Sequence, residues 1–190
     1  LLPLVVERLR AWPQRLGVAA DRPLCGLSQL AIGADTVFTR ACAALGWRQR
    51  LLLPQPTAEF LDAGEPGEPD FSAEERATAH ELLRLPHIEG VEVASRSNDR
   101  IVRFEDTNRA ILQASDAVVC LVREGAQARP GGTRDLMQRA LDAGKPVGLL
   151  LAGLNPVCTD AAGAAIMGFD PMAVRGTPPF SNRPASSSTP

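Results

Sequence analysis

Two short glycine-containing segments of this sequence carry residue types that bind phosphate groups. One covers residues 28–35 (S-Q-L-A-I-G-A-D) and the other covers residues 130–133 (P-G-G-T). Each follows an apolar run and precedes a helical pattern, and at that position of a parallel α/β sheet backbone N–H groups approach an anion. Two such turns in one small domain predict a nucleotide-like ligand held between them.

The residues predicted to bind this ligand lie in the two segments and just beyond one strand. They are Ser28, Gln29, Gly33, Ala34, Asp35, Arg123, Gly131, Gly132 and Thr133. The glycines supply backbone N–H groups, the two hydroxyl residues supply further donors, and the arginine supplies positive charge at the carboxyl end of its strand.

Each of these residues also has a structural interpretation, which the sequence leaves open. The glycines can serve only to make tight turns, and Thr133 can cap the following helix. Ser28 can bond the turn backbone, Arg123 can be solvated, and Asp35 fits a first-turn residue stabilised by the helix dipole better than a catalytic acid. Asn108 falls on the buried stripe of its helix and needs hydrogen-bond partners, either in a neighbouring element that it caps or in the ligand.

The sequence offers little for catalysis or for metal binding. It contains no G-x-S-x-G elbow, no P-loop and no matched pair of acids. His80 and His87 have no partner at metal-ligand spacing and are predicted to be solvated. The cysteines are far apart in the sequence and are predicted to be buried free thiols; they are Cys25, Cys42, Cys120 and Cys158.

Composition and charge exclude some classes of partner. The formal net charge is -2 and the pI is about 5.7, with scattered arginines, so no direct nucleic-acid partner is predicted. No apolar run is long enough to cross a bilayer and no signal sequence opens the chain, which predicts a cytoplasmic protein without a membrane partner.

The hydrophobic pattern alternates strands with helices. Strands are predicted at 24–28, 50–53, 91–94, 117–122 and 147–151, and helices at 4–16, 33–45, 72–85, 103–115 and 133–143. Continuous apolar strands separated by helices predict an α/β fold, with a Rossmann-like, mostly parallel sheet and helices on both faces. This single domain is predicted to cover residues 1–155, and the Gly/Pro/Ser-rich residues 156–190 are predicted to form an irregular or disordered tail.

The succession of motifs resembles the SLOG superfamily, which unites DNA-processing proteins, the LOG cytokinin-activating hydrolases and the sensor domain of TRPM channels. Residues 28–35 resemble the S-G-L-A-x-G-A-D turn of that group. The later motifs follow in the same order over residues 5–151: they are Asn108-Arg109-Ala110-Ile111-Leu112, Ser115-Asp116 before a strand, Gly131-Gly132-Thr133, and Gly144-Lys145-Pro146-Val147.

The resemblance implies a Rossmann-like domain that binds a nucleotide or a nucleotide-derived ligand, which some members hydrolyse and others only sense. It also implies a homo-oligomer, or a fused or partner effector domain. No cofactor is expected besides that ligand.

The chain departs from the SLOG pattern at three places. Gln29 stands where the group has glycine, so that a longer side chain occupies the turn. The strand expected before the first helix is missing from the sequence. The hydrolase branch resembles P-G-G-x-G-T-x-x-E, whereas here Leu136 occupies the place of the acid and Asp135 comes one residue early.

Three functions therefore remain open. The missing acid favours a domain that binds or senses a nucleotide-derived small molecule. The first alternative is a phosphoribohydrolase that cleaves an N-glycosidic bond with Asp35 or Asp135 as the acid. The second alternative is an assembly module with a vestigial pocket.

Overall fold

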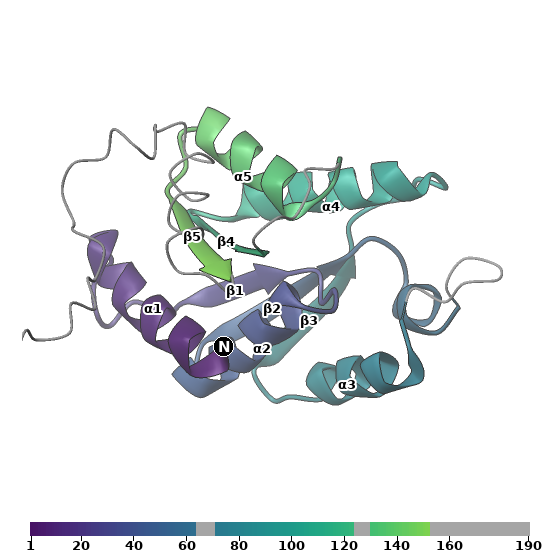
Figure 1. Ribbon diagram of the computed structural model, residues 1–190, viewed down its shortest axis with the longest axis horizontal. Coiled ribbons are helices and arrows are strands. Elements are labelled where there is room, and N and C mark those ends of the chain that lie inside the picture. Colours follow the sequence, from purple (N-terminus) through teal and green to yellow (C-terminus); the bar gives the residue numbers. More distant parts are fainter. Residues whose placement is uncertain (64–70, 124–129, 153–190) are drawn as a thin grey trace, which may run out of the picture. The chain divides into compact units, whose positions relative to one another are not determined.

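The chain begins with a helix and then alternates strands with helices (Figure 1). The computed structural model describes residues 1–63, 71–123 and 130–152. The helices are α1 (Leu2–Arg15), α2 (Ala34–Leu45), α3 (Ala73–Leu83), α4 (Arg100–Ala114) and α5 (Thr133–Asp142), with one π-helical segment, η1 (Ala58–Ala63). The strands are β1 (Cys25–Ser28), β2 (Arg48–Leu53), β3 (Ile88–Val93), β4 (Val118–Arg123) and β5 (Val147–Ala152).

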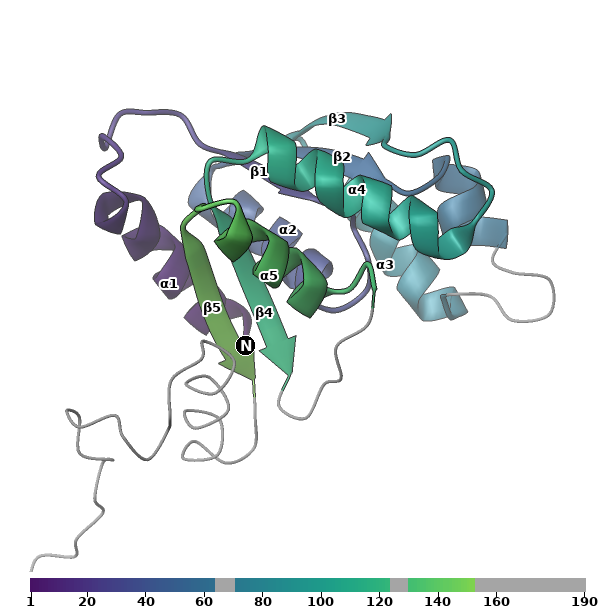
Figure 2. The same ribbon diagram turned by 90° about the horizontal axis from the view of Figure 1, so that it is seen from above.

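The strands form two parallel arrangements. β1, β2 and β3 make a three-stranded parallel sheet in that order, with β2 in the centre. β4 and β5 are hydrogen-bonded neighbours, and Figure 2 shows their arrows pointing in the same direction. Helices connect the strands of each sheet, as parallel pairing requires. The fold is therefore α/β and Rossmann-like, as predicted, although within the described residues no ladder joins β1 to β4.

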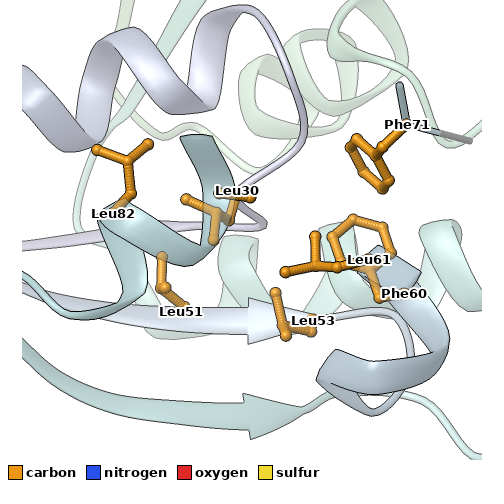
Figure 3. Close-up of a cluster of buried hydrophobic side chains, with 8 residues drawn as sticks. Leu30, Leu51, Leu53, Phe60, Leu61, Phe71 and Leu82 are labelled. Atoms are coloured by element: carbon orange, nitrogen blue, oxygen red, sulfur yellow. The ribbon is translucent and has the colours of Figure 1, made fainter. Parts of the chain in front are cut away.

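Helices cover both faces of the three-stranded sheet. Figures 1 and 2 show α3 and α4 on opposite sides of it. A buried apolar cluster fills the space between β2, η1 and α3 (Figure 3), and its members are Leu30, Leu51, Leu53, Phe60, Leu61, Phe71, Ala79 and Leu82. Within it the rings of Phe60 and Phe71 meet edge to face, with centroids 5.2 Å apart, a favourable aromatic geometry.

A second cluster packs α1 against α2 and against β4 and β5. Val5 and Leu9 of α1 pack with Ala41 of α2, and Val119 of β4 and Leu150 of β5 lie against them. Because fully burying one such side chain stabilises the fold by about 1.5–3 kcal/mol, this packing holds α1 and α2 against the two-stranded sheet.

The predicted elements agree with the structure to within a few residues, with one omission. The capping box predicted at the start of α3 is present: Ser72 Oγ accepts from the Glu75 N–H at 3.2 Å, and Glu75 Oε2 accepts from the Ser72 N–H at 2.7 Å. The π-helical segment η1 was not predicted, because six residues show no clear periodicity.

The prediction for the cysteines is only partly right. Cys42 and Cys120 are buried free thiols, and burial raises the pKa of each to about 12. Cys25, the first residue of β1, is exposed, so the prediction that it is buried is wrong. Cys158 lies outside the described residues.

Leu1–Val122 and Gln127–Leu150 form one compact unit, which contains the five helices described above. A second unit, Arg123–Ala126 and Leu151–Pro190, falls almost entirely outside the described residues, as do the predicted domain boundary and tail. Among the helices that are described, none has the length and apolarity that a bilayer crossing requires.

A buried amide on β2 fixes the end of β1. Gln49 Nε2 donates to Ser28 Oγ and to Thr39 Oγ1, each at 3.0 Å, and Gln49 is fully buried. Gln49 Oε1 lies 3.3 Å from His87 Nε2, so His87, predicted to be solvated, is half-buried by this contact. The network holds the Ser28 hydroxyl inside the protein, where it bonds a side chain and not the turn backbone.

Candidate functional site

The turn after β1 is held by a leucine in a strained conformation. Leu30 has φ of 64° and is completely buried in the apolar cluster. A left-handed conformation costs roughly 1–2 kcal/mol for a residue with a side chain, and burying a leucine returns about 1.5–3 kcal/mol. Gly33, at φ 110°, then supplies a conformation that suits only glycine, and α2 begins at Ala34.

Asp35 points back into this turn. Its Oδ2 accepts a hydrogen bond from the Ala31 N–H at 3.0 Å. Desolvation raises the pKa of Asp35 to about 6, although hydrogen bonds from the backbone of Ala31 and Gln29 act to lower it. A carboxyl group that titrates near neutrality is therefore placed in the first turn of α2.

The turn before α5 is built in a similar way. Gly131 has φ of 70°, and its N–H donates to Asp135 Oδ2 at 3.3 Å. Arg139 Nε donates to both oxygens of Asp135 at 3.0 Å, so this carboxylate is ion-paired. The N-cap residue is Gly132, and Thr133 is the exposed first residue of the helix. The interpretation of Thr133 as the cap is therefore wrong.

A side chain from α4 joins the two turns. Asn108 is only 3% exposed; its Nδ2 donates to the Gly131 carbonyl oxygen at 2.8 Å, and its Oδ1 accepts from Gln29 Nε2 at 2.6 Å. The turns after β1 and before α5, about a hundred residues apart in the sequence, are thus fixed to one buried amide. Asn108 was predicted to need partners, and here it finds them in both turns.

The N-termini of α2 and α5 both contain backbone donors that have no acceptor in their own helix. The N-cap residue of each helix is a glycine, which has no side chain that could accept a hydrogen bond from the first N–H groups. The first helical bonds are from the Val37 N–H to the Gly33 carbonyl and from the Leu136 N–H to the Gly132 carbonyl, so the N–H groups of residues 34–36 and 133–135 have no acceptor within their helices. Such groups, together with the helix dipole, create positive potential that suits an anion.

The structure links the two predicted segments through the hydrogen bonds of Asn108 to Gln29 and Gly131. Ser28 and Gln29 lie buried at the end of β1, with 4% and 8% of their surface exposed. Gly33 is exposed, and its N–H lies 3.4 Å from Thr36 Oγ1. Ala34 is half-buried. The backbone of Arg123 ends β4, but its side chain, like Arg129, lies outside the described part of the chain.

The sequence analysis missed Arg134 as a site residue. Arg134 is the second residue of α5, and its Nε is a buried nitrogen with no hydrogen-bond partner among the described residues. A buried donor without a partner is uncommon in folded proteins. Its place directly after the Gly131–Thr133 turn was the signal available in the sequence. Among the described residues, no group of three or more His, Cys, Asp or Glu side chains could hold a metal ion.

Asp35 gives the protein a measurable pH dependence. Its pKa is about 6 in the folded chain, above the ordinary aspartate value of 3.8, so the folded state binds the proton more tightly and this stabilisation is lost as the pH rises from about 4 to 6. Urea unfolding from pH 4 to 7 should show Asp35→Asn gaining roughly 1–3 kcal/mol relative to the wild type over that range. Parallel pH profiles for the two proteins would refute this assignment.

Asn108→Asp is expected to lower the free energy of unfolding by about 2–4 kcal/mol at pH 7, because a carboxylate cannot donate to the Gly131 carbonyl and brings a charge into a buried site. Asn98, exposed before α4, offers the matched control, and Asn98→Asp should change stability by less than about 0.5 kcal/mol. Equal effects of the two substitutions in urea unfolding would show that the Asn108 bridge is not important for stability.

Comparisons with known proteins give no match for this chain. No protein-family model matches the sequence, no curated protein matches it, and no solved structure matches its fold. The residues and contacts of this chain therefore carry the functional argument.

Proposed function

We propose that this chain binds a nucleotide-derived small molecule whose anionic group lies at the N-termini of α2 and α5. The observation that carries the proposal is the Asn108 bridge, which fixes the turns before both helices to one buried amide. The two glycine N-caps leave the first N–H groups of each helix available, and the unpartnered Nε of Arg134 adds a charged donor beside one of them.

The nucleotide character of the ligand rests on the resemblance to the SLOG superfamily, which is part of this proposal. The internal contacts of Asp135 favour binding or sensing over turnover, because that carboxylate is held by Arg139 and by the Gly131 N–H. A sensor of this kind acts in a cytoplasmic signalling system, through a homo-oligomer or an effector domain. The acidic net charge of the whole chain agrees with a small-molecule ligand and not with nucleic acid.

Thermal unfolding with inorganic phosphate and a panel of nucleoside monophosphates and diphosphates tests the proposal. A ligand present at a hundred times its Kd adds about 2.7 kcal/mol to stability. A clear shift with at least one nucleotide supports binding. The absence of any shift would contradict the proposal and would favour an assembly module.

Gly132→Asp should weaken anion binding by at least about 10-fold, because the new carboxylate occupies the N-terminus of α5 and repels the ligand. Without ligand the variant should be more stable by a few tenths of a kcal/mol, since aspartate is a better N-cap than glycine. Gly132→Asn is the matched control, because its neutral cap uses the same donor without adding charge. Isothermal titration should show a smaller loss for Gly132→Asn, and equal losses would argue against an anionic ligand at this helix.

One observation favours phosphoribohydrolase activity as a second candidate. The pKa of Asp35, raised to about 6 by desolvation, suits a general acid that works near neutral pH. If the chain is such an enzyme, purified protein releases free base from nucleoside monophosphates, and Asp35→Asn retains ligand binding but loses turnover. A wild type that binds nucleotides without releasing base excludes this candidate.

A further inference from the structure

Gln29 buries an amide at the place where the two turns meet. The residue is only 8% exposed and directly follows β1. Its side chain extends toward α4 and donates to Asn108. A glycine here would leave this space without a polar side chain, so the amide adds a specific hydrogen-bonding group to the candidate site.

The hydrogen bonds determine which way the Gln29 amide faces. The Gly131 carbonyl oxygen can only accept, so Asn108 must present its Nδ2 to Gly131 and its Oδ1 to Gln29. Asn108 Oδ1 in turn can only accept, so Gln29 must present its Nε2. The carbonyl oxygen of Gln29, Oε1, is consequently directed away from Asn108.

Gln29 Oε1 has an unused capacity to accept. Within the described part of the chain it makes no hydrogen bond, whereas Nε2 is bonded to Asn108. Among the described residues, the fully buried side-chain nitrogen or oxygen without a partner is Arg134 Nε. Gln29 Oε1 is not among these atoms, and Gln29 keeps 8% of its surface exposed.

We propose that Gln29 Oε1 accepts a hydrogen bond from a hydroxyl or amino group of the ligand, and so selects ligands that carry such a donor near their anionic group. This inference rests on the proposed function and adds a specificity-determining residue to it. A ribose hydroxyl and an exocyclic amino group of a base share the required chemistry. The hydrogen bond to Asn108 leaves Gln29 with this one acceptor, Oε1, for such a donor.

The experiment compares ligands that differ by one donor. Titration calorimetry measures the Kd of AMP, GMP and CMP, of their 2′-deoxy forms, and of IMP and UMP, which lack the exocyclic amino groups. The Kd of inorganic phosphate measures binding at the anion site alone. These ligands form two kinds of pair: a nucleotide with its 2′-deoxy form, and a nucleotide with its analogue that lacks the exocyclic amino group. In one kind of pair, the wild type should bind the nucleotide that carries the donor about 3- to 10-fold more tightly than the one that lacks it, the range expected for one net hydrogen bond. A difference in Kd between the ribose and 2′-deoxy forms identifies the donor as a hydroxyl, and a difference between the forms with and without the amino group identifies it as an amino group.

Gln29→Met keeps the length of the side chain and removes the acceptor. The ratio of the Kd values of the two ligands that differ in the donor should therefore fall to about one. Gln29→Gly provides a second variant that removes the acceptor if methionine disturbs folding. Gln138→Met makes the same chemical change on the exposed face of α5 and should keep the wild-type ratio. A purely structural role of Gln29 would weaken both members of a pair equally and leave their ratio unchanged.

A wild-type ratio near one in every pair, or a ratio that survives in both Gln29 variants, would overturn this inference and leave the proposed anion site intact. Binding of inorganic phosphate without any nucleotide preference would do the same. If the wild type binds neither phosphate nor any nucleotide, the proposed function fails, and the role of Gln29 fails with it.

Discussion

The candidate site depends on one buried side chain, Asn108, because its amide is bonded on both sides by turns that are distant in sequence. A buried amide without partners is unfavourable by about 1–3 kcal/mol, so the native arrangement is favoured only while both turns stay in place. The three-stranded and two-stranded sheets share no backbone ladder within the described residues. The hydrogen bonds of Asn108 therefore tie the turn after β1 to the turn between β4 and α5 through a side chain.

Each turn also carries its own acid, and the two acids have different surroundings. Asp35 accepts turn N–H groups in a desolvated place, and its pKa rises to about 6. Asp135 accepts the Gly131 N–H and is paired with Arg139. Both acids bond the backbone of their own turn, and these hydrogen bonds stabilise the two turns.

The sequence predicted the fold and the meeting of the two turns, because apolar strand runs, the Ser72–Glu75 capping box and the terminal Gly46 are local signals that the structure keeps. It also indicated that Asn108 needs partners. It could not identify Gly131 and Gln29 as those partners, because tertiary hydrogen bonds depend on the packing of α4. The exposure of Cys25 and the unpartnered Nε of Arg134 also depend on which neighbours surround a residue in three dimensions.

The polar atoms left over at the two turns bear on the choice between a binding domain and an assembly module. A module whose pocket has lost its use gains stability when a buried unpaired donor such as Arg134 Nε finds a partner or is replaced by an apolar group, since an unpaired buried donor lowers the stability of the fold. Among the described residues Arg134 Nε has no partner, and Gln29 Oε1 makes no hydrogen bond while Nε2 is bonded to Asn108. One is a donor and the other an acceptor, and a nucleotide offers both complements, in its anionic group and in its hydroxyl or amino groups. This complementarity is the reason that we propose a ligand-binding domain over an assembly module.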